Sequence, residues 1–138
     1  PGSDAVNLRN GAYIAIGDIN GDGKADLVFG GGPGGAPRVF ILSGATIIGS
    51  GVDAAEANPI ANFFVAGNSS DRGGVRVATT DADGDNKAEV VAGSGAGSAA
   101  RARVYLGKNF VGTTGEPTTF QDLAPFGGAV LADGVYVG

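Results

Sequence analysis

An acidic loop that runs directly into an apolar segment stands at Gly17-Asp18-Ile19-Asn20-Gly21-Asp22-Gly23-Lys24-Ala25-Asp26-Leu27-Val28-Phe29-Gly30. Oxygen-bearing side chains occupy the first, third, fifth and ninth loop positions, which are Asp18, Asn20, Asp22 and Asp26. The sixth position, Gly23, suits a sharp turn because glycine adopts a positive φ at little cost. Short runs of β-branched and aromatic residues are typical of strands, so the loop is predicted to join two strands.

The same pattern returns in the second half of the chain, where the second loop reads Asp81-Ala82-Asp83-Gly84-Asp85-Asn86-Lys87-Ala88-Glu89. Residues 11–44 align with residues 74–107 without a gap, and 14 of the 34 aligned positions are identical. A third start is indicated by Gly134-Val135-Tyr136-Val137, which resembles Gly11-Ala12-Tyr13-Ile14 and Gly74-Val75-Arg76-Val77. The chain is therefore predicted to hold two copies of one unit and the beginning of a third.

Each unit is predicted to form four short antiparallel strands, which makes the chain all-β. The expected strands are residues 12–16, 26–29, 38–42 and 61–65, then 75–79, 89–92, 102–106 and about 119–123. Four strands in about 63 residues match the size of one β-propeller blade. The expected division is a tail or cloning remnant at 1–10, blade one at 11–73, blade two at 74–133 and an extra strand at 134–138. One helical turn, with a capping box from Asp53 to Glu56, is expected before Pro59.

Composition removes several functional classes. The net charge of −5 and the pI of about 4.4 argue against nucleic acid and anionic membranes as partners. No apolar run approaches the ~20 residues that span a bilayer, so membrane insertion is not expected. Histidine and cysteine are absent, which excludes imidazole catalysis, thiolate chemistry and zinc sites built on those residues. The acidic residues outside the loops form no recognisable catalytic pair, so the chain is not expected to be an enzyme.

The two loops are predicted to bind one Ca²⁺ each. Calcium takes six to eight oxygen ligands, and carboxylates at alternate positions of a tight loop can converge on one ion. Half of the fourteen acidic residues lie in these two loops, where their mutual repulsion favours a bound cation. The second loop has four carboxylates and the first has three, so tighter binding is predicted at the second. A helical EF-hand is not indicated, because position twelve is Phe29 in one loop and Ala92 in the other. The competing interpretation is that Asp, Asn and Gly simply form polar turns.

Residues 17–30, with the Gly/Pro-rich segment 31–37 and the expected strand start Arg38-Val39-Phe40 after them, resemble the FG-GAP repeat of integrin α-subunit propellers and related bacterial secreted propellers. The resemblance implies blades with a structural calcium ion in the hairpin loop between the first two strands. It also implies an extracellular, cell-surface or periplasmic location and a role in adhesion or ligand binding. The implied ligands, with the two lysines acting through their carbonyl oxygens, are Asp18, Asn20, Asp22, Lys24 and Asp26, then Asp81, Asp83, Asp85, Lys87 and Glu89.

Two blades are fewer than the four or more of a closed propeller. The expected partners are therefore further blades of a longer chain or other copies of this chain, and a trimer with six blades is one closed solution. A protein or glycan ligand is also considered. The alternatives to a calcium-stabilised binding or scaffold module are a propeller-type lectin, a purely structural self-assembly unit and, least favoured, an enzyme of polysaccharide breakdown.

Overall fold

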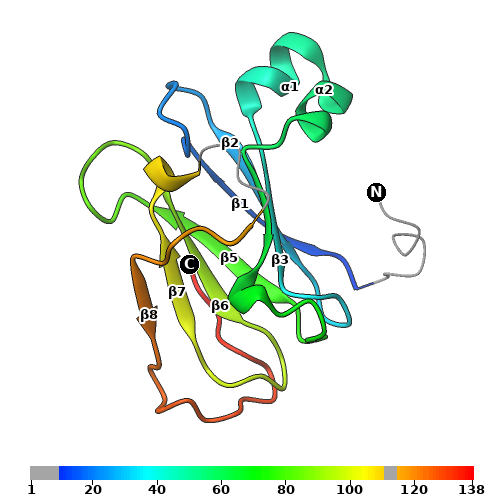
Figure 1. The fold of residues 1–138 in the computed structure, drawn as a ribbon, viewed down its shortest axis with the longest axis vertical. Coiled ribbons are helices and arrows are strands. Elements are labelled where there is room, and N and C mark those ends of the chain that lie inside the picture. Colours follow the sequence, from blue (N-terminus) through cyan, green and yellow to red (C-terminus); the bar gives the residue numbers. More distant parts are fainter. Residues whose placement is uncertain (1–9, 111–114) are drawn as a thin grey trace.

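The structure is a computed structural model that describes residues 10–110 and 115–138. Most of the predicted N-terminal tail, residues 1–9, lies outside the described residues. The chain is mostly β, as predicted, with two four-stranded antiparallel sheets (Figure 1). The first sheet consists in order of β1 (Ala12–Gly17), β2 (Asp26–Gly31), β3 (Arg38–Leu42) and β4 (Ala61–Phe64). The second consists of β5 (Val75–Thr80), β6 (Glu89–Ser94), β7 (Ala102–Tyr105) and β8 (Gln121–Leu123).

Equivalent residues are paired in the same register within each of the two sheets. In the first sheet Ala12 lies opposite Gly31, and in the second Val75 lies opposite Ser94. The sequence alignment that places Asp18 on Asp81 also places the first of these pairs on the second. The sequence repeat is therefore also a structural repeat, although the two sheets do not close into a ring (Figure 1).

The helices lie between β3 and β4. The helix α1 (Gly44–Ser50) was not predicted, and it begins where the Ser43 hydroxyl accepts a hydrogen bond from the Thr46 N–H. The helix α2 (Val52–Ala57) covers the predicted helical turn, but the predicted capping box is wrong, because its N-cap is Gly51 with no side-chain bond. Two short 3₁₀ segments follow β4 and β7, at Val65–Gly67 and Gly107–Asn109. With helices of seven and six residues, the described part of the chain has no helix that could cross a bilayer.

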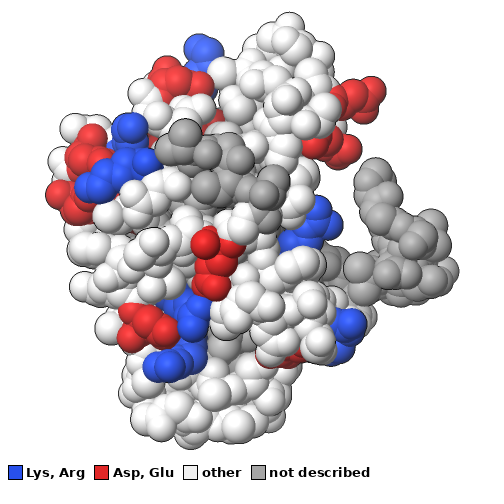
Figure 2. Space-filling view, viewed as in Figure 1, with Lys and Arg blue, Asp and Glu red and all other residues white. Residues whose placement is uncertain are grey.

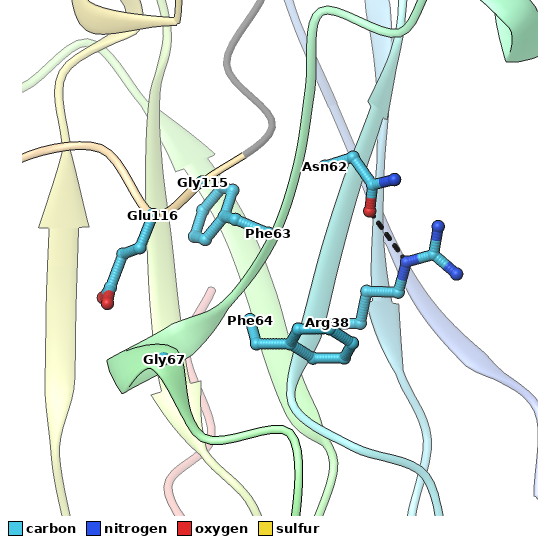
Figure 3. Close-up of a pocket in the computed structure, with 7 residues that line it drawn as sticks. All are labelled: Arg38, Asn62, Phe63, Phe64, Gly67, Gly115 and Glu116. Atoms are coloured by element: carbon cyan, nitrogen blue, oxygen red, sulfur yellow. Dashed lines mark hydrogen bonds between the residues drawn. The ribbon is translucent and has the colours of Figure 1, made fainter.

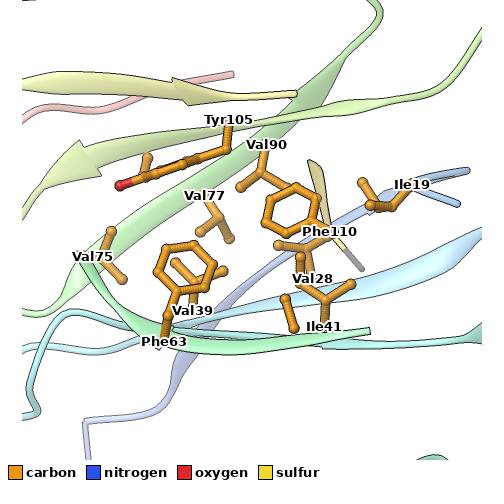
Figure 4. Packing of buried hydrophobic residues seen from close by; sticks show 12 residues of the cluster. Ile19, Val28, Val39, Ile41, Phe63, Val75, Val77, Val90, Tyr105 and Phe110 are labelled. Atoms are coloured by element: carbon orange, nitrogen blue, oxygen red, sulfur yellow. The ribbon is translucent and has the colours of Figure 1, made fainter. Parts of the chain in front are cut away.

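One hydrophobic core joins the two sheets (Figure 4). The first sheet contributes Val28, Val39, Ile41 and Phe63, and the second contributes Val75, Val77, Val90, Ala92 and Tyr105. The rings of Phe63 and Tyr105 meet edge to face, with centroids 5.1 Å apart. Other aromatic residues lie outside this core, since Phe120, Phe126 and Tyr136 are exposed. The two sheets are thus packed as one body around a shared apolar interior.

The predicted C-terminal strand is wrong, because the structure assigns no strand to residues 134–138. A strand needs a neighbour along its edge, whereas this segment approaches one face of the second sheet. Its backbone is tied to that sheet by a hydrogen bond from the Val135 N–H to the Ser94 carbonyl oxygen, at 2.9 Å. The segment is therefore docked without being paired.

Candidate metal centre

The two acidic loops lie beside each other at one end of the paired sheets. The Ala88 N–H of the second loop donates to the Asp18 carbonyl oxygen of the first, at 2.7 Å. Next to this contact, the Thr79 hydroxyl donates to the Ile16 carbonyl oxygen at 2.8 Å. Figure 1 shows both loops projecting on the same side of the molecule. The sequence predicted two loops but gave no indication that they touch.

The turn geometry agrees with the sequence prediction. At the sixth position Gly23 has a φ of 79° and Asn86 a φ of 65°, both in the left-handed region. Asparagine is among the few non-glycine residues that adopt this region readily. The fourth positions, Gly21 and Gly84, also have positive φ, at 79° and 78°, which the sequence analysis did not anticipate.

The acid at the ninth position has a structural task in both loops. Asp26 is fully buried, and its carboxylate accepts hydrogen bonds from the N–H groups of Ile19, Asn20 and Gly44, at 2.9, 3.3 and 3.0 Å. It therefore ties the start of its loop to the first residue of α1. A methyl group on Gly44 would overlap the Ala25 carbonyl oxygen, so only glycine fits there.

Glu89 repeats this arrangement in the second sheet. It is fully buried and accepts from the Ala82 N–H at 2.5 Å and the Gly107 N–H at 3.3 Å. Gly107 begins the 3₁₀ segment that follows β7, as Gly44 begins α1 after β3. The prediction treated both acids only as calcium ligands, because a bond between residues so distant along the chain leaves no pattern in the local sequence.

The carboxylates of the first loop accept hydrogen bonds mainly from backbone N–H groups. Its three carboxylates accept seven backbone hydrogen bonds. Asp18 alone takes those of Gly21, Asp22 and Gly23, at 2.7, 3.0 and 2.8 Å. Burial raises the pKa of Asp26, and the backbone donors of Gly44, Ile19 and Asn20 oppose that rise. These donors would compete with an ion for the lone pairs of the carboxylates.

In the second loop the acidic side chains lie closer together and accept fewer backbone hydrogen bonds per carboxylate. Ligand oxygens of Asp81, Asp83 and Glu89 all lie within 4.8 Å of one another. The four carboxylates of this loop, Asp85 included, accept six backbone hydrogen bonds. The first loop has Asn20 at the position of Asp83, and the Asn20 amide donates to Asp22 at 3.1 Å. The arrangement of the second loop is the better fit to a divalent cation, which needs several oxygens around one point.

Lys108 is a residue of this site that the sequence analysis missed. Its ammonium lies 2.6 Å from one Asp83 carboxylate oxygen and 3.9 Å from one of Asp85. This contact lowers the pKa of Asp83 and raises the pKa of Lys108. Figure 2 shows acidic and basic side chains side by side at this edge. The first loop has Ala45 at the equivalent position, so it has no counterpart of Lys108 there.

The two lysines at the seventh loop position differ in exposure. Lys24 is exposed, whereas Lys87 is half-buried and its side chain lies over Gly21, where an added methyl group would sit 2.7 Å from Lys87 Cε. Each lysine N–H donates to the aspartate two residues before it, at 2.9 Å in both loops. The role of their carbonyl oxygens as ligands stays a prediction.

Two hollows lie away from the loops. One of about 460 Å³ is lined by Arg38, Asn62, Phe64 and Glu116, among others, and the Arg38 Nε donates to Asn62 at 2.8 Å (Figure 3). Glu116 accepts from Arg103 and from the Tyr105 hydroxyl, both at 2.7 Å. A second hollow of about 810 Å³ covers the face of the first sheet that points away from the core. In the smaller hollow the charged groups are already paired, which favours a structural role for them.

Comparison of the chain with family models, with curated proteins and with solved structures finds no match in any of the three. The site is therefore described by its geometry alone, as two adjacent acidic loops on repeated antiparallel sheets.

Proposed function

We propose that the chain is a calcium-stabilised β-sheet repeat module with a binding or scaffold role outside the cytoplasm. Each sheet then serves as a propeller-type blade of the FG-GAP kind that the loops resemble. The observation that supports this proposal best is the convergence of Asp81, Asp83 and Glu89 oxygens within 4.8 Å. Two bound Ca²⁺ would also change the formal net charge from −5 to −1.

In this proposal the ion acts on folding and not on a substrate. The loops connect the first two strands of each sheet and touch each other through Ala88 and Asp18. A cation held by the loop carboxylates would screen their repulsion and fix both hairpins at the point where the sheets meet. Because only the folded chain assembles these oxygens, calcium would add to the free energy of unfolding by mass action.

The test is a thermal melt in EDTA and in about 10 mM calcium. Extracellular modules bind calcium with Kd values of about 10⁻⁴–10⁻³ M. Binding of that strength should raise the Tm by roughly 5–10 °C. Magnesium at the same concentration is a control for charge screening, because Mg²⁺ keeps its waters more tightly. Equal Tm values in EDTA and calcium would contradict the proposal.

The double variant Asp83→Ala/Asp85→Ala assigns the effect to the second loop. It should lose the part of the calcium-dependent Tm rise that comes from this site. Glu56→Gln is the matched control, because Glu56 is an exposed acid outside the loops. A calcium response that survives in the double variant and disappears in Asp18→Ala/Asp22→Ala would move the site to the first loop.

A further inference from the structure

Among residues 10–110 and 115–138, one face of the first sheet stays open. The face that points away from the core carries Ile14 and Ile16, which are 59% and 60% exposed, and Phe64, which is 37% exposed. Phe29 and Phe40 lie on the same face, because Ile14 pairs with Phe29 and Phe29 with Phe40 across the strands. We call these five residues the open face. Large apolar side chains gathered on a sheet in this way mark an interaction surface.

In the second sheet the equivalent face is buried. The repeat places Ile14 on Val77, which is 7% exposed, and Phe29 on Ala92, which is 2% exposed. Val77 and Ala92 pack in the core against the first sheet. The sheets therefore stack head to tail, so that one face of a unit covers the opposite face of the unit before it. The open face is the surface that this stacking leaves uncovered at the first unit.

The opposite end of the stack is the outer face of the second sheet, formed by Arg76, Val91, Gly93 and Val104. Arg76 and Gly93 are paired across β5 and β6, and Val91 and Val104 across β6 and β7. By the repeat this face corresponds to the core face of the first sheet, since Gly93 corresponds to Gly30 and Val104 to Ile41. It is therefore the surface on which a next unit would stack.

The C-terminal segment Gly134–Gly138 occupies that outer face. A methyl group on Gly30 would overlap the Val75 carbonyl oxygen and lie 3.0 Å from Val77 Cγ1. A methyl group on Gly93 would overlap the Val135 carbonyl oxygen and lie 3.1 Å from Val137 Cγ1. The C-terminal segment thus sits on the second sheet as the start of β5 sits on the first.

Two further observations support the same placement. Gly74 and Gly134 have φ values of 73° and 72°, so the chain enters both positions in the same conformation. The Arg76 guanidinium lies between two aromatic rings, 5.2 Å from the Tyr13 centroid and 4.2 Å from that of Tyr136. Tyr13, Arg76 and Tyr136 are the equivalent residues of the three unit starts.

We propose that the open face of one copy of this chain packs on the outer face of another copy, and that Gly134–Gly138 competes for that surface within each copy. The segment Gly11-Ala12-Tyr13-Ile14 is the counterpart of Gly134-Val135-Tyr136-Val137, so both cannot occupy one outer face. A second copy is the occupant because one chain supplies both complementary faces in matching register. Such a contact is heterologous, and it either closes a ring or continues as a filament.

The contact uses no loop carboxylate. Failure of the calcium proposal therefore leaves this inference standing, and the reverse also holds. The variants below are measured in EDTA and in calcium, so that the two outcomes are read separately.

The first experiment uses the full chain with Val135→Asp/Val137→Asp, which should release the segment Gly134–Gly138 from the outer face. Sedimentation equilibrium should show masses above the 13.4 kDa of one chain. This association should begin at a concentration at least about tenfold lower than for the unmodified chain, because a tethered segment competes at millimolar effective concentration. Val130→Asp is the control, because Val130 is 66% exposed beside this segment. If the released variant does not associate at lower concentrations than the unmodified chain, the proposal is overturned. The open face would then belong to another partner.

The second experiment tests the direction of the contact and does not depend on the released variant. Ile14→Glu/Ile16→Glu blocks the open face, and Gly93→Val blocks the outer face. Each variant alone should keep the mass of one chain at concentrations where the unmodified chain associates. Their mixture should form a 1:1 complex, because each retains one complementary face. Self-association of the Gly93→Val variant, or a mixture that does not associate, would contradict head-to-tail packing.

Discussion

The first loop and the second loop begin from nearly the same sequence and reach different electrostatic solutions. The first loop turns backbone N–H groups toward its carboxylates, with Asp18 and Asp26 accepting three each. The second loop brings oxygens of three of its four acids, Asp81, Asp83 and Glu89, within 4.8 Å of one another and places the Lys108 ammonium on Asp83. A repeated acidic motif can thus keep its hairpin while the groups that balance its charge change. In the first loop the charge is balanced mostly by backbone N–H groups, whereas the second loop adds to its six backbone hydrogen bonds a side-chain cation that an ion could replace.

The largest effect is expected from Asp26→Ala. It leaves the N–H groups of Ile19 and Gly44 without a partner in the interior, and each such loss costs about 1–3 kcal/mol. The free energy of unfolding should fall by about 3 kcal/mol, measured by urea denaturation in EDTA. Glu89→Ala, which removes two backbone bonds instead of three, should cost less. A greater loss for Glu89→Ala would reverse the comparison.

A change in calcium affinity is expected from Lys108→Ala. Removing the ammonium that pairs with Asp83 frees an oxygen and removes a competing charge, so calcium should bind the second loop about tenfold more tightly. Isothermal titration calorimetry measures this directly. The reciprocal variant Ala45→Lys places a cation at the equivalent position and should weaken any binding at the first loop. Unchanged affinity in both variants would show that Lys108 is not part of the site.

A moderate loss of stability is expected from Gly23→Ala. An added Cβ would meet nothing within 4 Å, so the cost comes only from the φ of 79°, and it should be about 1 kcal/mol. Gly49→Ala is the matched control, because that position is also open but lies inside α1. It should stabilise the chain by up to about 1 kcal/mol. At the second loop, Asn86→Gly should change the free energy of unfolding by only a few tenths of a kcal/mol.

The smallest expected effect is a difference in sign between the pH dependences that Asp26 and Asp83 give to the free energy of unfolding. The pKa of Asp26 is raised in the folded chain, so its contribution to stability decreases as the pH rises from its ordinary value through the raised one. The pKa of Asp83 is lowered, so its contribution is present above the ordinary value and is lost as the pH falls through the lowered one. Denaturation in EDTA between about pH 3 and pH 6, with Asp26→Asn and Lys108→Ala, should separate the two trends. Trends of the same sign would contradict the assigned environments.

The sequence determined the features that depend on local pattern and spacing. The acidic frame, the apolar runs and the constant spacing of the repeat predicted two four-stranded sheets with nearly correct strands, because strand and turn preferences act over a few residues. The left-handed turn at Gly23 and Asn86 was predictable for the same reason. The predicted metal ligands, their calcium ions and the propeller arrangement stay proposals.

Only the tertiary structure decided how distant residues meet. The bond of Asp26 to Gly44, the ion pair of Lys108 with Asp83 and the docking of Val135 on Ser94 all join positions that lie far apart along the chain. Such contacts depend on how whole sheets pack, so no local pattern encodes them. The same packing buried Val77 and left its counterpart Ile14 open, because in a stack of equivalent units the position of a unit determines which of its faces is covered.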